Sequence, residues 1–180
     1  QVLNDIIHAA EAKGLEALPV HIKIDSGMHR LGFYQEDIPA LIERLQQQKA
    51  VRVASVFSHL AGSDEAQFDS FTHEQARYFQ ACATQLQSAL NYPIIKHLCN
   101  TAGIERFPEY HYDMCRLGIG LYGMSFLQTT DSRHTTSSLR NVCTLKTTIL
   151  SIKTVPANAT IGYGRHTTLS EPRQIAVIPI

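Results

Sequence analysis

The stretch Val20-His-Ile-Lys-Ile-Asp25 alternates apolar and polar residues without a break. Because successive side chains of a β-strand point to opposite faces of its sheet, this pattern predicts a strand. Val51-Arg-Val-Ala-Ser-Val-Phe-Ser-His59 and Pro93-Ile-Ile-Lys-His-Leu98 predict two more strands, and residues 113–117 predict a fourth. Helices are expected between these strands, so the strands determine the fold class.

Helical spacing fills the segments around the predicted strands. Apolar residues recur at i, i+3, i+4 and i+7 in residues 3–10 and again in residues 38–45. Thr72-x-x-Gln75 resembles a capping box that opens a helix running to Leu90. With a short helix before the fourth strand, the order is typical of parallel β/α units.

Unusual polar residues lie at or just past the C-terminal ends of the predicted strands. A (β/α)8 barrel of the TIM type collects its active site at this face. An open doubly wound sheet also binds ligands there, so the pattern alone leaves both architectures open. These residues are Lys23, Asp25, His59, Asn100, Thr101 and Arg116.

The chain changes character near Leu127. Residues 128–141 are mostly polar and predict a linker. Residues 142–180 contain apolar runs rich in Thr, Ile and Val, broken by Pro and Gly. We therefore expect an α/β domain over residues 1–127 and the beginning of a β-rich domain over residues 142–180.

Composition narrows the class of protein. The 16 basic and 16 acidic residues cancel, which gives no electrostatic case for nucleic acid or an anionic membrane surface. No apolar run reaches the roughly 18 residues of a membrane span. The four cysteines form no CxxC pair, and the nine histidines lack HExxH or zinc-knuckle spacing. We expect reduced thiols, a cytoplasmic protein and no metal site.

Both ends of the chain look cut. It opens with Gln1 inside a helical pattern and stops inside the strand-like run of residues 175–180. We therefore expect a piece of a longer protein.

Arg116 lies in the stretch His111-Tyr-Asp-Met-Cys-Arg-Leu-Gly-Ile-Gly-Leu-Tyr-Gly-Met124, between apolar residues and just before a glycine-rich turn. Burying an arginine is costly unless acceptors meet it. Glycines let a backbone approach a ligand closely. Arg116 is either a member of a structural ion pair or a ligand contact, and its neighbours favour the ligand.

Two basic residues near the first strand raise the same question. Lys23 shares a strand face with Asp25, and a buried ammonium must be paired, neutralised or modified. A Lys23–Asp25 pair is one alternative. The loop Ser26-Gly-Met-His-Arg-Leu-Gly32 presents Arg30, which is either a solvated charge or a ligand contact.

The third strand and the glycine-rich turn suggest an anion site. Asn100 and Thr101 either only cap a short helix or bind phosphate through a hydroxyl and free amides. Gly118 and Ile119 could add backbone N–H groups. His59 is either a core histidine or a group beside a flat ligand. Together these residues describe a phosphorylated aromatic cofactor.

Five motifs resemble, in order and spacing, those of the alanine racemases, and the resemblance spans nearly the whole chain. It implies a pyridoxal 5'-phosphate-dependent isomerase that interconverts L- and D-alanine and so supplies D-alanine for peptidoglycan. It also implies a head-to-tail homodimer, and a chain that is the C-terminal half of a (β/α)8 barrel followed by the start of a β domain. The motifs are Lys23-x-Asp-Ser-Gly-Met-x-Arg-Leu-Gly32, Ser58-His-Leu-Ala-Gly-Ser-Asp64, His97-x-x-Asn-Thr101, Arg116-x-Gly-Ile-x-x-Tyr-Gly123 and Ile161-Gly-Tyr-Gly164.

The resemblance assigns cofactor-binding roles. By position, Arg116 resembles the arginine that faces the pyridine nitrogen, and His59 the histidine that supports it. Since a guanidinium keeps its proton near neutrality, the ring nitrogen would stay unprotonated and the cofactor would be a weaker electron sink. Thr101, Gly118 and Ile119 resemble the phosphate cradle.

The resemblance also assigns roles in substrate chemistry. Arg30 resembles the arginine that contacts the cofactor's phenolic oxygen and the substrate carboxylate. Lys23 resembles a lysine that is often carbamylated in this family, which would make it an acceptor for Arg30. Tyr163 resembles the catalytic tyrosine that reaches across the dimer to exchange the Cα proton.

The family's Schiff-base lysine has no counterpart here, because it would lie upstream of Lys23. We expect the intact parent to racemise alanine and these 180 residues alone to be inactive. One alternative is another pyridoxal-phosphate barrel enzyme, such as a serine or broad-specificity racemase. Another is a non-catalytic binding domain on the same scaffold. A decarboxylase is disfavoured, since decarboxylases of this fold usually place an acid where Arg116 stands.

Overall fold

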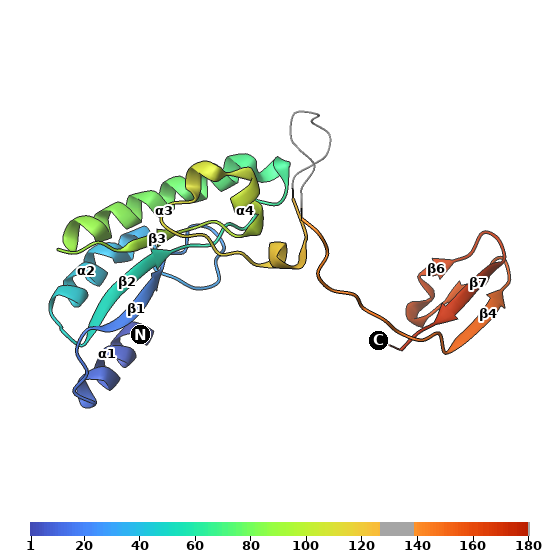
Figure 1. Cartoon of the computed structure of the whole chain (residues 1–180), viewed down its shortest axis with the longest axis horizontal. Coiled ribbons are helices and arrows are strands. Elements are labelled where there is room, and N and C mark those ends of the chain that lie inside the picture. Colours follow the sequence, from blue (N-terminus) through green and yellow to red (C-terminus); the bar gives the residue numbers. More distant parts are fainter. Residues whose placement is uncertain (127–138, 180) are drawn as a thin grey trace. The chain divides into compact units, whose positions relative to one another are not determined.

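The computed structural model describes residues 1–126 and 139–179. These residues belong to two compact units, one over Gln1–Val142 and the other over Cys143–Ile180 (Figure 1). The first unit contains a parallel sheet and its helices, and the second contains short antiparallel strands.

The sheet of the first unit has three parallel strands in the order β1-β2-β3. They are β1 (Leu18–Lys23), β2 (Val51–Phe57) and β3 (Ile95–His97). The predicted strands at these three places are confirmed: β1 begins and ends two residues earlier than predicted, and β2 and β3 are shorter than predicted. Because the strands are parallel, their carboxyl ends lie at the same end of the sheet, where the polar residues were expected.

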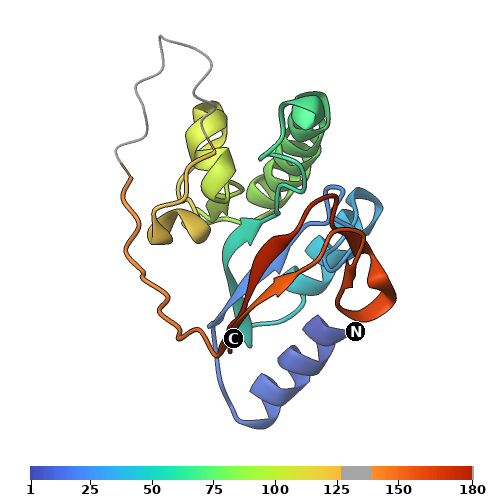
Figure 2. The ribbon, with the colours of Figure 1, turned by 90° about the vertical axis from the view of Figure 1, so that its right-hand side faces the viewer.

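Helices follow the strands and pack on the sheet. Contacts join α2 to α3 and α3 to β2, and Figure 2 shows the long helix α3 almost end-on. The α-helices are α1 (Val2–Ala12), α2 (Ile38–Gln46), α3 (Asp69–Ala89) and α4 (Thr101–Arg106), with 3-10 turns at Gln35–Asp37, Ala66–Phe68, Pro108–Tyr110 and Ile119–Tyr122.

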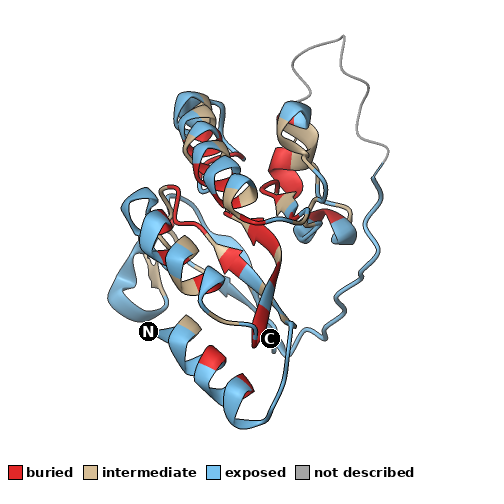
Figure 3. Cartoon of the chain, turned by 90° about the vertical axis from the view of Figure 1, so that its left-hand side faces the viewer, coloured by how far each residue is buried: buried red, intermediate tan, exposed pale blue. Residues whose placement is uncertain are grey.

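The core lies between the sheet and these helices, where Figure 3 colours the buried residues red. Ile24, which directly follows β1, has no exposed surface, and the same holds for Val53 and Val56 of β2 and for Phe79 and Leu86 of α3. On the central strand β2, Val51, Val53 and Ser55 bury one face, whereas the other face is buried at Val56 and exposed at Arg52.

The predicted capping box was wrong. Helix α3 begins at Asp69, so Thr72 and Gln75 lie inside it, and both side chains are fully buried. The capping signal failed because the 3-10 turn Ala66–Phe68 already leads into the helix.

The predicted fourth strand was also wrong. Residues 113–117 run beside β3 but form a single parallel bridge, between Met114 and His97. Further contact comes from the Asp113 N–H, which donates to the Lys96 carbonyl, and from the Arg116 N–H, which donates to the Cys99 carbonyl. The Lys96 N–H donates to the Asp113 side-chain carboxylate, so it is not available for a regular backbone ladder with this segment.

In the second unit, β4 (Ser151–Val155) pairs with β7 (Arg173–Val177), and β5 (Thr160–Ile161) pairs with β6 (Thr167–Thr168). Of the expected linker, residues 128–138 lie outside the described part, and residues 139–141 have no regular structure. None of the helices in residues 1–126 and 139–179 combines the length and apolar character that a membrane span requires.

Candidate active site

A pocket of about 480 Å³ opens where β2 and β3 end. It brings together most of the residues that were expected to bind a cofactor, although they come from three separate segments. We call it the Arg116 pocket; among its lining residues are His59, Asn100, Thr101, Arg116, Gly118 and Ile119.

The guanidinium of Arg116 is held by neutral acceptors. It donates to the carbonyl oxygens of Ser58 at 2.6 Å, Leu98 at 3.0 Å and His97 at 3.2 Å. It also bonds to the Nδ1 atoms of His97 at 2.7 Å and His59 at 3.3 Å. No carboxylate of the described residues pairs with Arg116, so the alternative of a structural ion pair finds no partner there.

One N–H group of the Arg116 guanidinium is not used by these hydrogen bonds. Both terminal nitrogens make the bonds given above, whereas the Nε–H has no hydrogen-bond partner in residues 1–126 and 139–179. Burial lowers the pKa of Arg116 below its usual range, yet a guanidinium remains charged near neutrality. The pocket therefore offers a fixed cation with a spare N–H.

His97 is neutral and its tautomer follows from its partners. Since Arg116 can only donate, the Nδ1 of His97 must accept, and its proton lies on Nε2. Burial lowers the pKa of His97 to about 4, and the charge of Arg116 acts in the same direction. Burial and the same charge also lower the pKa of His59. Phe57 stacks on the His97 ring at 5.0 Å.

The low pKa of His97 gives stability a defined pH dependence. The unfolded histidine takes up a proton near pH 6.5, whereas the folded one does so near pH 4. Stability is therefore complete above about pH 6.5 and falls by up to about 3 kcal/mol as the pH drops to about 4. Urea unfolding of the wild type and His97→Gln across this range measures it. Parallel curves for the two proteins would contradict a neutral, buried His97.

Thr101 organises the glycine-rich turn. Its Oγ1 accepts hydrogen bonds from the backbone N–H groups of Gly118 and Gly120, both at 3.1 Å. A hydroxyl has two lone pairs and one proton, so after accepting twice it still has an O–H to donate. Thr101 is 5% exposed and lies at the pocket wall, which makes a bound anion a suitable acceptor.

Sequence reasoning missed Gly120. A Cβ at this position would lie 2.6 Å from Thr101 Cγ2 and 2.9 Å from Leu117 Cδ1, so the turn can approach Thr101 only with glycine there. The alternation Gly118-Ile-Gly120 was the available signal.

Asn100 caps helix α4, as one of its two interpretations predicted. Its Oδ1 accepts from the Gly103 N–H and from the Ser63 hydroxyl, both at 2.9 Å. Its Nδ2 donates to the Leu60 carbonyl at 3.2 Å. Asn100 thus joins the start of α4 to the segment after β2.

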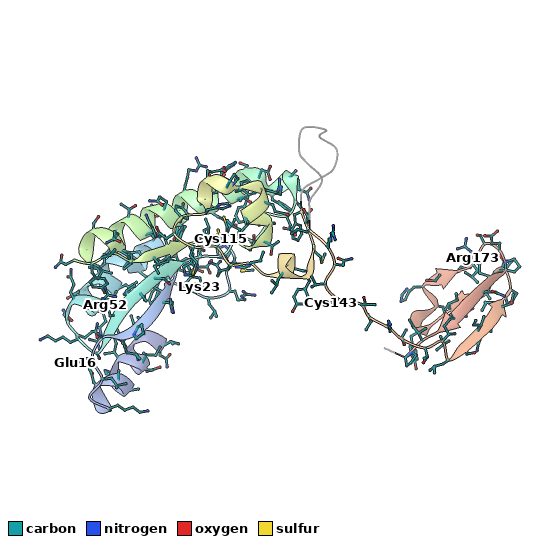
Figure 4. All side chains as sticks on the ribbon, in the orientation of Figure 1. Glu16, Lys23, Arg52, Cys115, Cys143 and Arg173 are labelled. Carbon is teal, nitrogen blue, oxygen red and sulfur yellow. The ribbon has the colours of Figure 1, made fainter. Side chains whose placement is uncertain are left out.

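Lys23 and Asp25 do not form the pair that was one alternative. Lys23 is half-buried at the end of β1 (Figure 4) and has no ion pair in the described residues. The Asp25 carboxylate instead accepts from the backbone N–H groups of Gly27 and His29, at 3.1 and 2.9 Å. Burial opposes ionisation of Asp25, but these donors leave its pKa lowered.

Arg30 is exposed and makes no hydrogen bond or ion pair with the residues that the structure describes. Its loop returns to β1 at Gly32, whose φ is +131° and where a Cβ would lie 2.6 Å from the Asp25 nitrogen. The loop is therefore shaped by glycine, while Arg30 and Lys23 do not line the Arg116 pocket.

Tyr163 belongs to the second unit and not to the unit that contains the pocket. Its side chain is 103% exposed. It opens a 3-10 turn between Gly162 and Gly164, which have φ angles of 73° and 71°. These left-handed glycines present the tyrosine at a sharp turn.

Two family models divide the chain between them. The one described as "Alanine racemase, N-terminal domain" matches residues 2–126, which is more than half of the chain. This chain belongs to the alanine racemase family. The model described as "Alanine racemase, C-terminal domain" matches residues 142–180.

Relatives and solved structures agree with this membership. "Alanine racemase 1" of Oceanobacillus iheyensis is 37% identical over 184 residues, covering 100% of the chain and 47% of that protein. The alanine racemase of Streptomyces lavendulae has a TM-score of 0.72 at 26% identity, covering 99% of this chain and 47% of that one. A Bartonella henselae alanine racemase structure "with covalently bound pyridoxal phosphate" has a TM-score of 0.68 at 23% identity, covering 98% and 46%. The chain thus spans about half the length of these relatives.

Within this member of the alanine racemase family, Gln75 is a further residue that sequence reasoning misjudged. It is fully buried in α3, where its Oε1 accepts from the Ala61 N–H at 2.9 Å. Its Nε2 donates to the His59 carbonyl at 3.2 Å. Gln75 therefore fixes the backbone that carries His59, a tertiary role that the local capping pattern concealed.

Proposed function

We propose that the protein containing this chain is an alanine racemase that binds pyridoxal 5'-phosphate and interconverts L- and D-alanine, supplying D-alanine for peptidoglycan. Family membership and the names of the relatives support this activity. The observation that carries it is one pocket in which Arg116, held only by neutral acceptors, lies with the Thr101 hydroxyl.

The residues of the pocket fit the phosphate of this cofactor. The Thr101 O–H has no acceptor among the described residues once its two lone pairs are used. The backbone N–H of Ile119 also has no partner within residues 1–126 and 139–179. Donors without acceptors at a pocket wall favour an anion with several oxygens, and Asn100 holds the helix start in place.

Arg116 fits the ring of the cofactor. Its spare Nε–H can donate to a pyridine nitrogen, which in its neutral form is only an acceptor. The cofactor supplies an electron sink that acidifies the Cα–H of a bound amino acid. Arg116 keeps the proton off the ring nitrogen, because a guanidinium does not release its own proton near neutral pH. His59 and His97 bond to the two terminal nitrogens of Arg116 as neutral acceptors.

The remaining roles are proposals from the family resemblance. Arg30, which has no protein partner in the described residues, would bind the substrate carboxylate and the cofactor's phenolic oxygen. Lys23, half-buried and without an ion pair there, is the candidate for carbamylation, which would replace a costly ammonium with an acceptor. Intact-mass measurement of the freshly purified protein, before and after acid treatment, would detect the added carboxyl group.

We propose that Tyr163 moves a proton at the substrate Cα as part of a homodimer whose subunits share their sites. Its complete exposure and its sharp glycine turn suit a residue that acts outside its own unit. A cytoplasmic location is consistent with four unpaired cysteines.

The three parallel strands and their helices would be the C-terminal half of a (β/α)8 barrel, with a domain over residues 1–127, a linker over 128–141 and the start of a β domain over 142–180. Since the relatives are about twice as long, the lysine that binds the cofactor covalently would come from outside this chain. We expect the 180 residues alone to lack turnover.

Thr101 provides the test of cofactor binding. In the whole protein, Thr101→Val leaves two backbone N–H groups without their acceptor and removes the O–H. We expect the affinity for pyridoxal phosphate to fall by about 30- to 100-fold, which corresponds to about 2–3 kcal/mol. Thr101→Ser keeps the hydroxyl and should stay within about threefold of the wild type. Absorbance titration measures both, and unchanged binding by Thr101→Val would refute the proposed phosphate site.

Racemisation assays separate the alternatives. An alanine racemase converts L-alanine to D-alanine faster than it converts L-serine, whereas a serine racemase or a broad-specificity enzyme would not show this preference. A protein that binds the cofactor with no turnover of either substrate would be a binding domain.

A further inference from the structure

A chain of hydrogen bonds leads from Arg116 away from the pocket. His97 bonds to Arg116 through Nδ1, and its Nε2 lies 3.0 Å from the Ser55 Oγ. The same Ser55 oxygen lies 2.6 Å from the Nδ1 of His21. The chain Arg116–His97–Ser55–His21 crosses all three strands of the sheet.

The strand register brings the members of this chain together. Val20 pairs with Val53, but the pairing then skips Ala54 of β2, and the next residue of β1, His21, pairs with Ser55. Regular pairing would set His21 beside Ala54, whose side chain points to the other face of the sheet. Such irregularities redirect side chains. Here the redirected residue is a histidine, and it meets the buried hydroxyl of the central strand.

The direction of each hydrogen bond follows from the first. Because Arg116 donates to His97 Nδ1, the Nε2 of His97 carries a proton and donates it to Ser55 Oγ. Ser55 then gives its own O–H to His21 Nδ1, which accepts. Ser55 is 1% exposed, so water does not replace either partner at this position. Every group in the chain therefore has one orientation that satisfies its neighbours.

We propose that Ser55 and His21 are positioning residues for Arg116: they hold the His97 ring so that its Nδ1 faces the guanidinium. This deepens the proposed function and rests on it only for the importance of Arg116 to the cofactor. Ser55 acts through His97, and His21 acts through Ser55. Neither residue lines the Arg116 pocket.

Nuclear magnetic resonance of protein labelled with ¹⁵N in the histidine rings tests the chain of bonds without any cofactor. In the wild type, His97 should carry its proton on Nε2, and this proton should exchange slowly with water. In Ser55→Ala the exchange should be at least tenfold faster, and in His21→Leu at least threefold faster. His21 is exposed, so this second variant tests the chain even if Ser55→Ala does not fold.

Thr72→Val is the matched control. Thr72 is fully buried, and its Oγ1 has no hydrogen-bond partner in the part of the chain that the structure describes. Losing this hydroxyl should leave the His97 signals unchanged. A wild-type His97 with its proton on Nδ1 would overturn the proposal. Exchange rates in His21→Leu and Ser55→Ala that stay within twofold of the wild type would also overturn it.

Pyridoxal phosphate titration of the whole protein adds the functional measurement. We expect Ser55→Ala to weaken binding at least fivefold and Thr72→Val to leave it unchanged. If the wild type does not bind the cofactor while the His97 signals behave as expected, the proposed function fails and the positioning of Arg116 stands. If the wild type binds the cofactor, and Ser55→Ala and His21→Leu bind it as tightly as the wild type does, Ser55 and His21 are not positioning residues.

Discussion

Replacing Arg116 with methionine is expected to lower the free energy of unfolding by about 3 kcal/mol or more. The substitution leaves the carbonyl oxygens of Ser58 and Leu98 and the Nδ1 of His97 without the donor that Arg116 supplies, and each unsatisfied buried acceptor costs about 1 kcal/mol or more. Arg116→Lys should recover only part of this loss, because an ammonium cannot spread its donors across all of these acceptors. Urea unfolding of the wild type, Arg116→Met and Arg116→Lys measures these free energies.

Arg52→Met is the matched control for this prediction. Arg52 is exposed and lies over the Tyr92 ring at 4.1 Å, an interaction of about 0.5–1 kcal/mol at such a site. If Arg116→Met cost no more than Arg52→Met, the bonds around the guanidinium would not be stabilising the end of the sheet. Cofactor affinity, measured on the same variants, should fall when Arg116 is replaced and stay unchanged in Arg52→Met.

Tyr163→Phe should lower racemisation in the whole protein by about 10²- to 10⁴-fold, the usual contribution of a positioned acid or base. Its side chain is completely exposed, so the loss of one hydroxyl should change the free energy of unfolding by less than about 0.5 kcal/mol. A large loss of activity at unchanged stability distinguishes a catalytic hydroxyl from a structural one. Initial rates in both directions, together with urea unfolding, test this.

Tyr122→Phe serves as the control for the tyrosine hydroxyl. Tyr122 is also exposed, and it is the last residue of the 3-10 turn Ile119–Tyr122. Its hydroxyl has no assigned part in the reaction, so the rate should stay within about twofold of the wild type. Equal rates for Tyr163→Phe and the wild type would remove Tyr163 from the proposed chemistry.

The sequence predicted the parts of the fold that depend on local periodicity. The alternation in residues 20–25 predicted a strand, the order of strands and helices predicted parallel pairing, and the polar residues at the strand ends led to the Arg116 pocket. Thr72 and Gln75 were misjudged, because a capping pattern is a local signal while their environment is set by residues far along the chain. Gln75 is buried by contacts with Ala61 and His59, which no local window contains.

The sequence predicted which residues form the site better than it predicted the hydrogen bonds between them. Arg116 and Thr101 stood out by their neighbours, but the sequence could not say that Gly120 completes the turn. The link between Ser55 and His21 depends on the irregular register between β1 and β2, which no sequence pattern indicates. Contacts that depend on how two strands pair cannot be predicted from the pattern of each strand alone.

The bonds of Arg116 have a consequence for folding kinetics. They join Arg116 to Ser58, which is 58 positions away in sequence, and to Leu98, which is 18 away. Such contacts close only after the segments that follow β2 and β3 have come together, so the pocket should assemble late in folding. A ligand that binds only the assembled pocket would then slow unfolding more than it speeds folding, and would lengthen the lifetime of the native state.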